Sequence, residues 1–132
     1  IRQAHTAVIR YLLDANCAIY AMIDANGPIS QRIAQLAPGD IAISAISFSE
    51  VALGTQNQRP PPPEVLDAFV AAVPIVPFDE AAAREYAKLP FKRARFDRLL
   101  AAHALSIGAI VVTNNEADFA DVPGLVVENW AV

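Results

Sequence analysis

The stretch Arg98-Leu-Leu-Ala-Ala-His-Ala-Leu-Ser-Ile-Gly108-Ala-Ile-Val-Val-Thr113 contains the two periodicities that decide the fold. Its first part places apolar side chains at helical spacing, which predicts a helix over 98–107. Gly108 then supplies the left-handed residue that commonly ends a helix. The short apolar run 110–113 is typical of a buried strand. A helix followed directly by such a strand indicates an α/β fold.

The same alternation of short apolar runs and longer amphipathic segments extends over the rest of the chain. It predicts a central parallel sheet with right-handed crossovers, flanked by helices on both faces in an α/β/α arrangement. At 132 residues the chain fits one domain spanning 1–132, with residues 1–7 expected to be a flexible or added N-terminal extension. We predict strands at 8–13, 41–44, 75–76, 110–113 and 125–127, and helices at 17–23, 29–36, 48–55, 64–72, 80–88 and 98–107.

The composition is rich in apolar residues for a protein of this size. Hydrophobic residues make up 55% of the chain and the mean hydropathy is +0.33, so we expect apolar surface that another chain covers. No apolar run reaches the roughly 18 residues that a membrane-spanning helix needs. Cys17 is the only cysteine and can form no internal disulfide, which favours a reducing cytoplasm.

Four carboxylates each lie where an apolar segment ends or a helix begins. Asp14 and Asp118 would come from strand ends, whereas Glu50 and Asp97 would come from helix starts. In a parallel sheet such positions gather at the carboxyl ends of the strands. Carboxylate oxygens are the ligands that Mg²⁺ and Mn²⁺ prefer. The set therefore predicts a divalent-metal site and metal-assisted phosphoryl chemistry.

Each acid also has an ordinary structural explanation. Asp14 and Asp97 could accept hydrogen bonds from, or interact with the dipole of, the helices that they precede or begin. Ser47 and Glu50 have the spacing of a capping box, and Asp118 lies in a polar turn, where Asp is common. Singly each acid is more often structural, but four that reach the same edge favour the metal site.

The net charge of −4 conceals an uneven distribution of cations. Half of the ten Lys and Arg residues lie close to Asp97. An acidic pocket beside a basic rim suits a phosphodiester substrate, since the rim can hold backbone phosphates while the pocket holds a cation. A solvated charged loop is the alternative explanation. The clustered cations are Lys88, Lys92, Arg93, Arg95 and Arg98.

Several fragments, in their order and spacing, resemble the PIN domain of VapC-type toxins, the toxin half of bacterial toxin–antitoxin pairs. The resemblance covers the chain from about Ile9 to Trp130. The fragments that carry it are Tyr11-Leu-Leu-Asp14-Ala-Asn16, Pro38-Gly-Asp-Ile-Ala-Ile-Ser44 leading to Glu50, Asp97-Arg-Leu-Leu-Ala-Ala-His-Ala-Leu105, Val112-Thr-Asn-Asn115 to Asp118-Phe119, and Val122-Pro-Gly-Leu-Val-Val-Glu-Asn-Trp130.

This resemblance implies an endoribonuclease that uses Mg²⁺, with Mn²⁺ as a substitute, to hydrolyse RNA with activated water. It also implies a cognate VapB-type antitoxin, in a heterotetramer or larger assembly. The apolar composition separately favours a homodimer, and the single cysteine a cytoplasmic protein. The family's four acidic positions, catalytic and metal-binding, fall on Asp14, Glu50, Asp97 and Asp118. Nearby supporting polar positions fall on Asn16, Thr113 and Asn115, and we assign RNA binding to Lys92, Arg93, Arg95 and Arg98.

Two departures from the family pattern concern metal affinity and substrate choice. Ala15 follows Asp14 where many relatives carry Thr, so one hydroxyl beside the site is missing. The segment 89–95 before the third acid is shorter and more basic than usual. Neither departure removes a carboxylate, so the expected activity stands.

Two other functions remain open from the sequence. The same fold could act on DNA or on a small phosphate ester, or the chain could be a catalytically silent binding module whose acids only cap helices. Three further residues are expected to serve packing: His103 as a core or interface histidine, Cys17 as a small buried hydrophobe, and Trp130 as a packing anchor.

Overall fold

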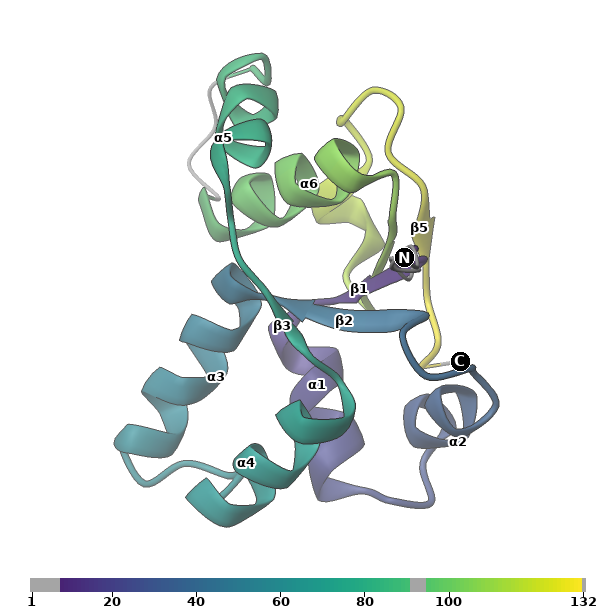
Figure 1. Ribbon diagram of the computed structural model, residues 1–132, viewed down its shortest axis with the longest axis vertical. Coiled ribbons are helices and arrows are strands. Elements are labelled where there is room, and N and C mark those ends of the chain that lie inside the picture. The colour runs from purple at the N-terminus through teal and green to yellow at the C-terminus, as the bar shows by residue number, and fades with distance from the viewer. Residues whose placement is uncertain (1–7, 91–94, 132) are drawn as a thin grey trace, which may run out of the picture.

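The structure, a computed structural model, describes residues 8–90 and 95–131. At its centre lies a five-stranded sheet in which every neighbouring pair of strands is parallel. The strand order is β3-β2-β1-β4-β5 (Figure 1). The predicted parallel sheet is thus confirmed. The strands are β1 (Tyr11–Leu13), β2 (Ile41–Ser44), β3 (Ile75–Val76), β4 (Ile110–Val112) and β5 (Val127–Glu128).

Helices cover both faces of this sheet, which confirms the α/β/α prediction. The first four helices lie on one face, and α6 lies on the other with α5 packed against it (Figure 1). The helices are α1 (Ala15–Ile23), α2 (Pro28–Ala34), α3 (Ala45–Gln56), α4 (Pro63–Ala72), α5 (Glu80–Ala87) and α6 (Arg95–Ile107), followed by the short 3₁₀ helix η1 (Glu116–Phe119).

Strand β1 shows why the predicted strands are continuous apolar runs. Tyr11 and Leu13 belong to a hydrophobic cluster that includes Val51 of α3. Leu12 belongs to a second cluster that includes Leu100 of α6. Because successive strand residues point to opposite faces, a strand that is covered on both faces has to be apolar throughout.

The predicted strands at 41–44 and 75–76 match the structure, and the others are shorter or shifted by one or two residues. Gly108 has a φ of 69°, which confirms it as the left-handed residue after α6. The helix predicted at 48–55 begins earlier in the structure, at Ala45. Ser44 caps α3, because its side chain accepts a hydrogen bond from the Ile46 amide at 3.0 Å. The alternative explanation of Glu50 as part of a capping box with Ser47 is therefore excluded, because both residues lie inside α3.

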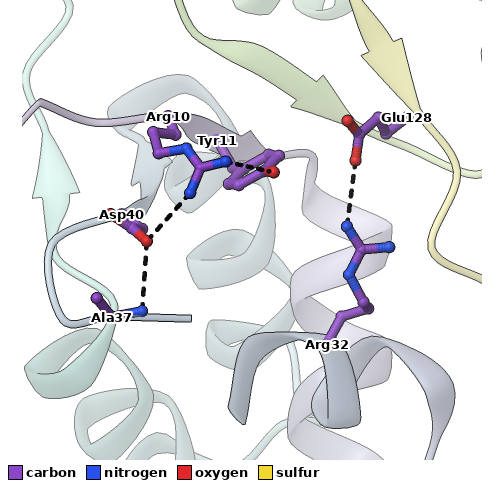
Figure 2. Close-up of polar contacts among 6 residues, drawn as sticks. All are labelled: Arg10, Tyr11, Arg32, Ala37, Asp40 and Glu128. Atoms are coloured by element: carbon purple, nitrogen blue, oxygen red, sulfur yellow. Dashed lines mark hydrogen bonds and ion pairs between the residues drawn. The ribbon is translucent and has the colours of Figure 1, made fainter. Parts of the chain in front are cut away.

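Polar contacts tie together the amino ends of the strands, opposite the ends that carry the acids (Figure 2). Arg10 approaches the Asp40 carboxylate at 3.5 Å and donates to the Tyr11 hydroxyl at 3.3 Å. Figure 2 also shows an ion pair of 3.4 Å between Arg32 of α2 and Glu128, the last residue of β5. The contacts of Arg10 thus brace the amino ends of β1 and β2, whereas Arg32 holds the carboxyl end of β5.

Within the described ranges, no helix is both long and apolar enough to cross a membrane. The extension predicted at residues 1–7 lies outside the described residues.

Candidate active site

The carboxyl ends of β1 and β4 form the floor of the candidate site. The two strands are parallel neighbours, with Leu13 paired to Val112. The Asp14 amide donates to the Val112 carbonyl at 3.0 Å, so the first acid is held directly against the end of β4. Because parallel strands end together, the segment that starts at Thr113 emerges beside Asp14.

Asp14 serves as the N-cap of α1 in addition to any role in the site. Its Oδ1 accepts a hydrogen bond from the Cys17 amide at 2.8 Å. The cap fixes the carboxylate in one orientation and offsets an unpaired amide at the helix start. The structural and functional explanations of Asp14 are thus compatible. Asn16, a predicted supporting residue, is exposed in the first turn of the same helix.

Glu50 reaches the site from α3, which packs against α6. Desolvation raises the pKa of Glu50 above its ordinary value, and the charges of Asp97 and Asp14 raise it further. Burial alone raises a carboxyl pKa, but a like charge adds to the shift only when it lies nearby. Glu50 therefore lies close to both acids, although they come from other elements.

Asp97 and Asp118 are neighbouring acids whose carboxyl groups interact directly. Partial burial raises the pKa of Asp97 to about 6, with further contributions from the charge of Asp118, a hydrogen bond between the two carboxyls and the charge of Asp14. The Asn115 amide group donates to Oδ2 of Asp118. The Asn115 backbone amide in turn donates to the buried Thr113 hydroxyl at 3.0 Å. The supporting residues Thr113 and Asn115 thus shape the turn that presents Asp118.

The four predicted acids therefore gather at one edge of the sheet, as the sequence indicates. In the part of the chain that the structure describes, no three His, Cys, Asp or Glu side chains converge on one point in a way that would hold a metal ion. The acids are close enough to repel one another without sharing a single ligation point. All four are carboxylates, so the donor chemistry fits Mg²⁺ or Mn²⁺.

The predicted basic rim is described only in part. Lys88 is exposed and pairs with Glu85 at 2.9 Å. Lys92 and Arg93 lie outside the described residues, as does the side chain of Arg95. For these three the predicted RNA contact stays a prediction.

Arg98 requires a correction. Its side chain is only 3% exposed, and its guanidinium donates to Asp121 Oδ1 at 3.0 Å and to the Pro90 carbonyl at 3.1 Å. Since the buried guanidinium is committed to these partners, it cannot project to a phosphate on the surface. Arg98 anchors α6 to the segments on either side of it, and we replace its predicted role in RNA binding with this structural role.

The three residues assigned to packing are buried, which confirms that assignment. Burial raises the pKa of the Cys17 thiol, which therefore stays protonated. Trp130 is 2% exposed and meets the Tyr11 ring edge-on at a centroid distance of 4.9 Å. His103 is 1% exposed and hydrogen-bonds Ser44, a partner that sequence spacing gave no means to identify. A Ser between an apolar strand and a helix does signal a cap, and this signal was missed at Ser44.

The model of the PIN domain family matches residues 11–125. Similar proteins include a tRNA(fMet)-specific endonuclease VapC of Shigella flexneri, which is 29% identical over 94% of this chain and 100% of its own length. Ribonuclease VapC2 of Rickettsia felis is 30% identical over 91% of this chain and 97% of that protein. All four predicted acids lie inside the matched range.

Solved structures agree with these relatives. One similar structure is VapBC2 of Rickettsia felis bound to a promoter DNA fragment. The chain superposes on it with a TM-score of 0.77 and 28% identity, over 92% of this chain and 99% of that one. For DNA-bound VapBC of Salmonella typhimurium the TM-score is 0.78, with 26% identity and coverage of 92% and 98%. The fold is therefore shared over nearly the whole length of each protein.

Proposed function

The chain belongs to the PIN domain family, with VapC ribonucleases among its homologues, and we propose that it is a VapC-type endoribonuclease dependent on Mg²⁺ or Mn²⁺. The observation that carries this proposal is the mutual influence of Asp14, Glu50, Asp97 and Asp118, which come from four different elements. A purely structural set of helix caps has no reason to crowd like charges together, since the crowding is unfavourable.

The acids would hold the cation and position it against the substrate. When bound, a divalent cation would offset the negative charge of a phosphodiester and lower the pKa of attacking water. Asp97 and Glu50 have raised pKa values, so each binds a proton more readily than an isolated carboxyl and has to release it before it can serve as a ligand. Asn115 holds Asp118 in place through its side-chain amide.

RNA binding is the part of the proposal that depends on the basic segment before α6. This segment adjoins Asp97, so phosphates held by Lys92, Arg93 and Arg95 would lie next to the acids in the chain. Arg98 supports the segment by holding the carbonyl of Pro90, where the segment begins. Contacts of this kind bind phosphate and carry no sequence code.

We further propose a homodimer and a cytoplasmic complex with a VapB-type antitoxin, in keeping with the VapBC structures that the chain resembles. A mostly apolar cavity of about 280 Å³ lies between α1 and α2 and is a suitable surface for the antitoxin. Its walls include Tyr20, 42% exposed, and Ile23, 57% exposed. An Arg or Lys of the antitoxin that reaches the acids would compete with the metal, so inhibition and metal loss would coincide.

The test is cleavage of labelled single-stranded RNA by the purified protein with added MnCl₂ or MgCl₂. We expect cleavage with either metal, loss on addition of EDTA, and recovery when metal is restored in excess. An Asp118→Asn variant purified in parallel controls for contaminating ribonuclease. Absence of cleavage of every RNA tested, in a protein that shows no affinity for Mn²⁺, would refute the proposal and favour a silent binding module. Equal cleavage of DNA would favour the broader nuclease.

A further inference from the structure

A buried hydrogen bond joins α6, which carries Asp97, to the residue that caps α3, which carries Glu50. His103 Nδ1 of α6 lies 2.8 Å from Oγ of Ser44, the last residue of β2. Ser44 is 0% exposed and His103 is 1% exposed. Neutral groups hydrogen-bonded in the protein interior, away from water, hold their partners in a narrow range of geometry.

Ser44 also fixes the start of α3. Its hydroxyl oxygen accepts from the Ile46 amide at 3.0 Å while it contacts His103, so one oxygen atom connects the first turn of α3 to the middle of α6. In the sheet, Ser44 is paired with Val76 of β3, which prevents it from moving independently of the sheet. The position of α6 relative to α3 is thus set at a rigid point.

A buried histidine that served packing alone would destabilise the fold relative to an apolar residue. Burial lowers its pKa, so the imidazole is neutral, and its Nε2 atom has no hydrogen-bond partner among the described residues. The Phe78 ring meets it edge-on at 5.6 Å between centroids. A Leu or Met at this position would fill the space without an unpaired nitrogen, which would avoid the desolvation penalty. The imidazole therefore has a use that apolar packing does not supply.

The two partners occupy equivalent positions relative to the acids. Glu50 follows Ser44 by six residues in α3, and Asp97 precedes His103 by six residues in α6. At about 1.5 Å of rise per residue, each acid lies about 9 Å along its helix from the hydrogen bond. The two helices that carry these acids pack directly against each other.

We propose that Ser44 and His103 form a positioning pair that fixes the separation of Glu50 on α3 from Asp97 on α6. Neither residue is a catalytic residue. A small change in the angle between two helices, set at the hydrogen bond, is carried along both helices to their carboxylates. The effect of this pair on metal binding rests on the proposed function, whereas its effect on the separation of the two helices does not.

The test compares His103→Leu, which removes the hydrogen bond with little change in volume, with His103→Asn, whose amide can occupy the place of Nδ1. Leu66→Ala of the buried face of α4 is the control for a general loss of stability. Nitroxide labels at Ser49→Cys and Phe96→Cys, both exposed and each next to one acid, report the separation without metal or RNA. Cys17 is fully buried and should not label, which a sample without added cysteines checks.

We expect His103→Leu to broaden the distribution of label distances and to weaken Mn²⁺ binding roughly 10- to 100-fold, with kcat reduced and KM for RNA little changed. His103→Asn should restore the narrow distribution and most of the affinity, and Leu66→Ala should leave both as in the wild type. Label distances in His103→Leu that match the wild type would overturn the positioning role. Failure of the wild type to bind Mn²⁺ would instead refute the proposed function, and the label distances would still decide on the pair.

Discussion

Asp97 of α6 lies against Asp118 of η1, and partial burial, together with the neighbouring carboxylate, raises the pKa of Asp97 to about 6. The two residues are separated by a helix and a strand in the sequence, and β4 brings them together. A carboxyl with this pKa titrates within the range in which ribonucleases are assayed. In the proposed metal site, its protonation state would therefore control whether a cation can bind.

The first prediction is that RNA cleavage rises with pH through a midpoint near 6 at limiting Mn²⁺. A proton and a cation compete for Asp97, so the midpoint should fall as the Mn²⁺ concentration is raised. The measurement is the initial cleavage rate from pH 5 to 8 at several Mn²⁺ concentrations. A midpoint that stays fixed over a hundredfold range of metal would contradict the assignment of Asp97 as a ligand.

The second prediction concerns stability. Because the pKa of Asp97 is higher in the folded than in the unfolded state, the folded protein binds the proton more tightly. This contribution to stability is fully present below about pH 4, near the unfolded pKa, and is lost as the pH rises through about 6. Asp97→Asn should therefore raise the free energy of unfolding by roughly 1–2 kcal/mol at pH 7.5 and have little effect at pH 4. Urea denaturation at the two pH values, without added metal, measures the difference.

The third prediction separates the two roles of Asp14. Asp14→Asn keeps an oxygen that can accept from the Cys17 amide, so α1 should remain capped and the protein should stay as stable as the wild type. Asp14→Ala removes the cap and should lower the free energy of unfolding by about 1 kcal/mol. Both should abolish metal-dependent cleavage, because neither retains the charge. Thermal unfolding and a cleavage assay on the same samples test this, and cleavage by the Asn variant would show that Asp14 only caps the helix.

The order of strands and helices could be predicted because the central strands are buried on both faces and so are continuous apolar runs, as at 41–43. The gathering of the acids followed from topology alone, since parallel strands end at one edge. The start of α3 was missed because two serines compete as caps, and only the contact between Ser44 and Ile46 identifies the one that is used.

Long-range polar partners could not be predicted. Arg98 looked like one more cation in a basic cluster, and nothing in the local sequence indicates that Asp121 and Pro90 enclose it. The partner of His103 lies 59 residues away in the sequence, at the end of β2. Such pairs depend on how helices pack and not on periodicity, so sequence patterns report the burial of a helix face but not what a polar side chain meets there.

The fourth prediction tests whether Lys92, Arg93 and Arg95 contact RNA while Arg98 only stabilises the fold. Replacing Lys92, Arg93 and Arg95 together with Gln should weaken RNA binding and reduce the slope of log affinity against log salt by about 2, since each phosphate contact on a single strand releases about 0.7 counterion. Arg98→Met should leave the slope unchanged, yet lower the free energy of unfolding by roughly 1–3 kcal/mol because it removes the hydrogen bonds that Arg98 donates to Asp121 and to the Pro90 carbonyl. Fluorescence anisotropy across a salt series gives the slopes. Equal slopes for the wild type and the triple variant would show that the segment does not contact RNA.

The last prediction concerns the apolar surface between α1 and α2. Ile23 is 57% exposed and lines the apolar cavity there, so a partner chain that covers it would bury a large aliphatic side chain. Ile23→Lys should therefore weaken binding of a co-expressed antitoxin by at least tenfold. Cleavage of RNA by the isolated protein should stay as in the wild type, because Ile23 lies at the end of α1 remote from Asp14.

Leu53→Lys is a matched control, since Leu53 is 64% exposed on α3 and does not line the cavity. Co-purification and titration calorimetry measure the loss. Unimpaired binding by Ile23→Lys, or an equal loss in the Leu53 control, would place the antitoxin on another surface.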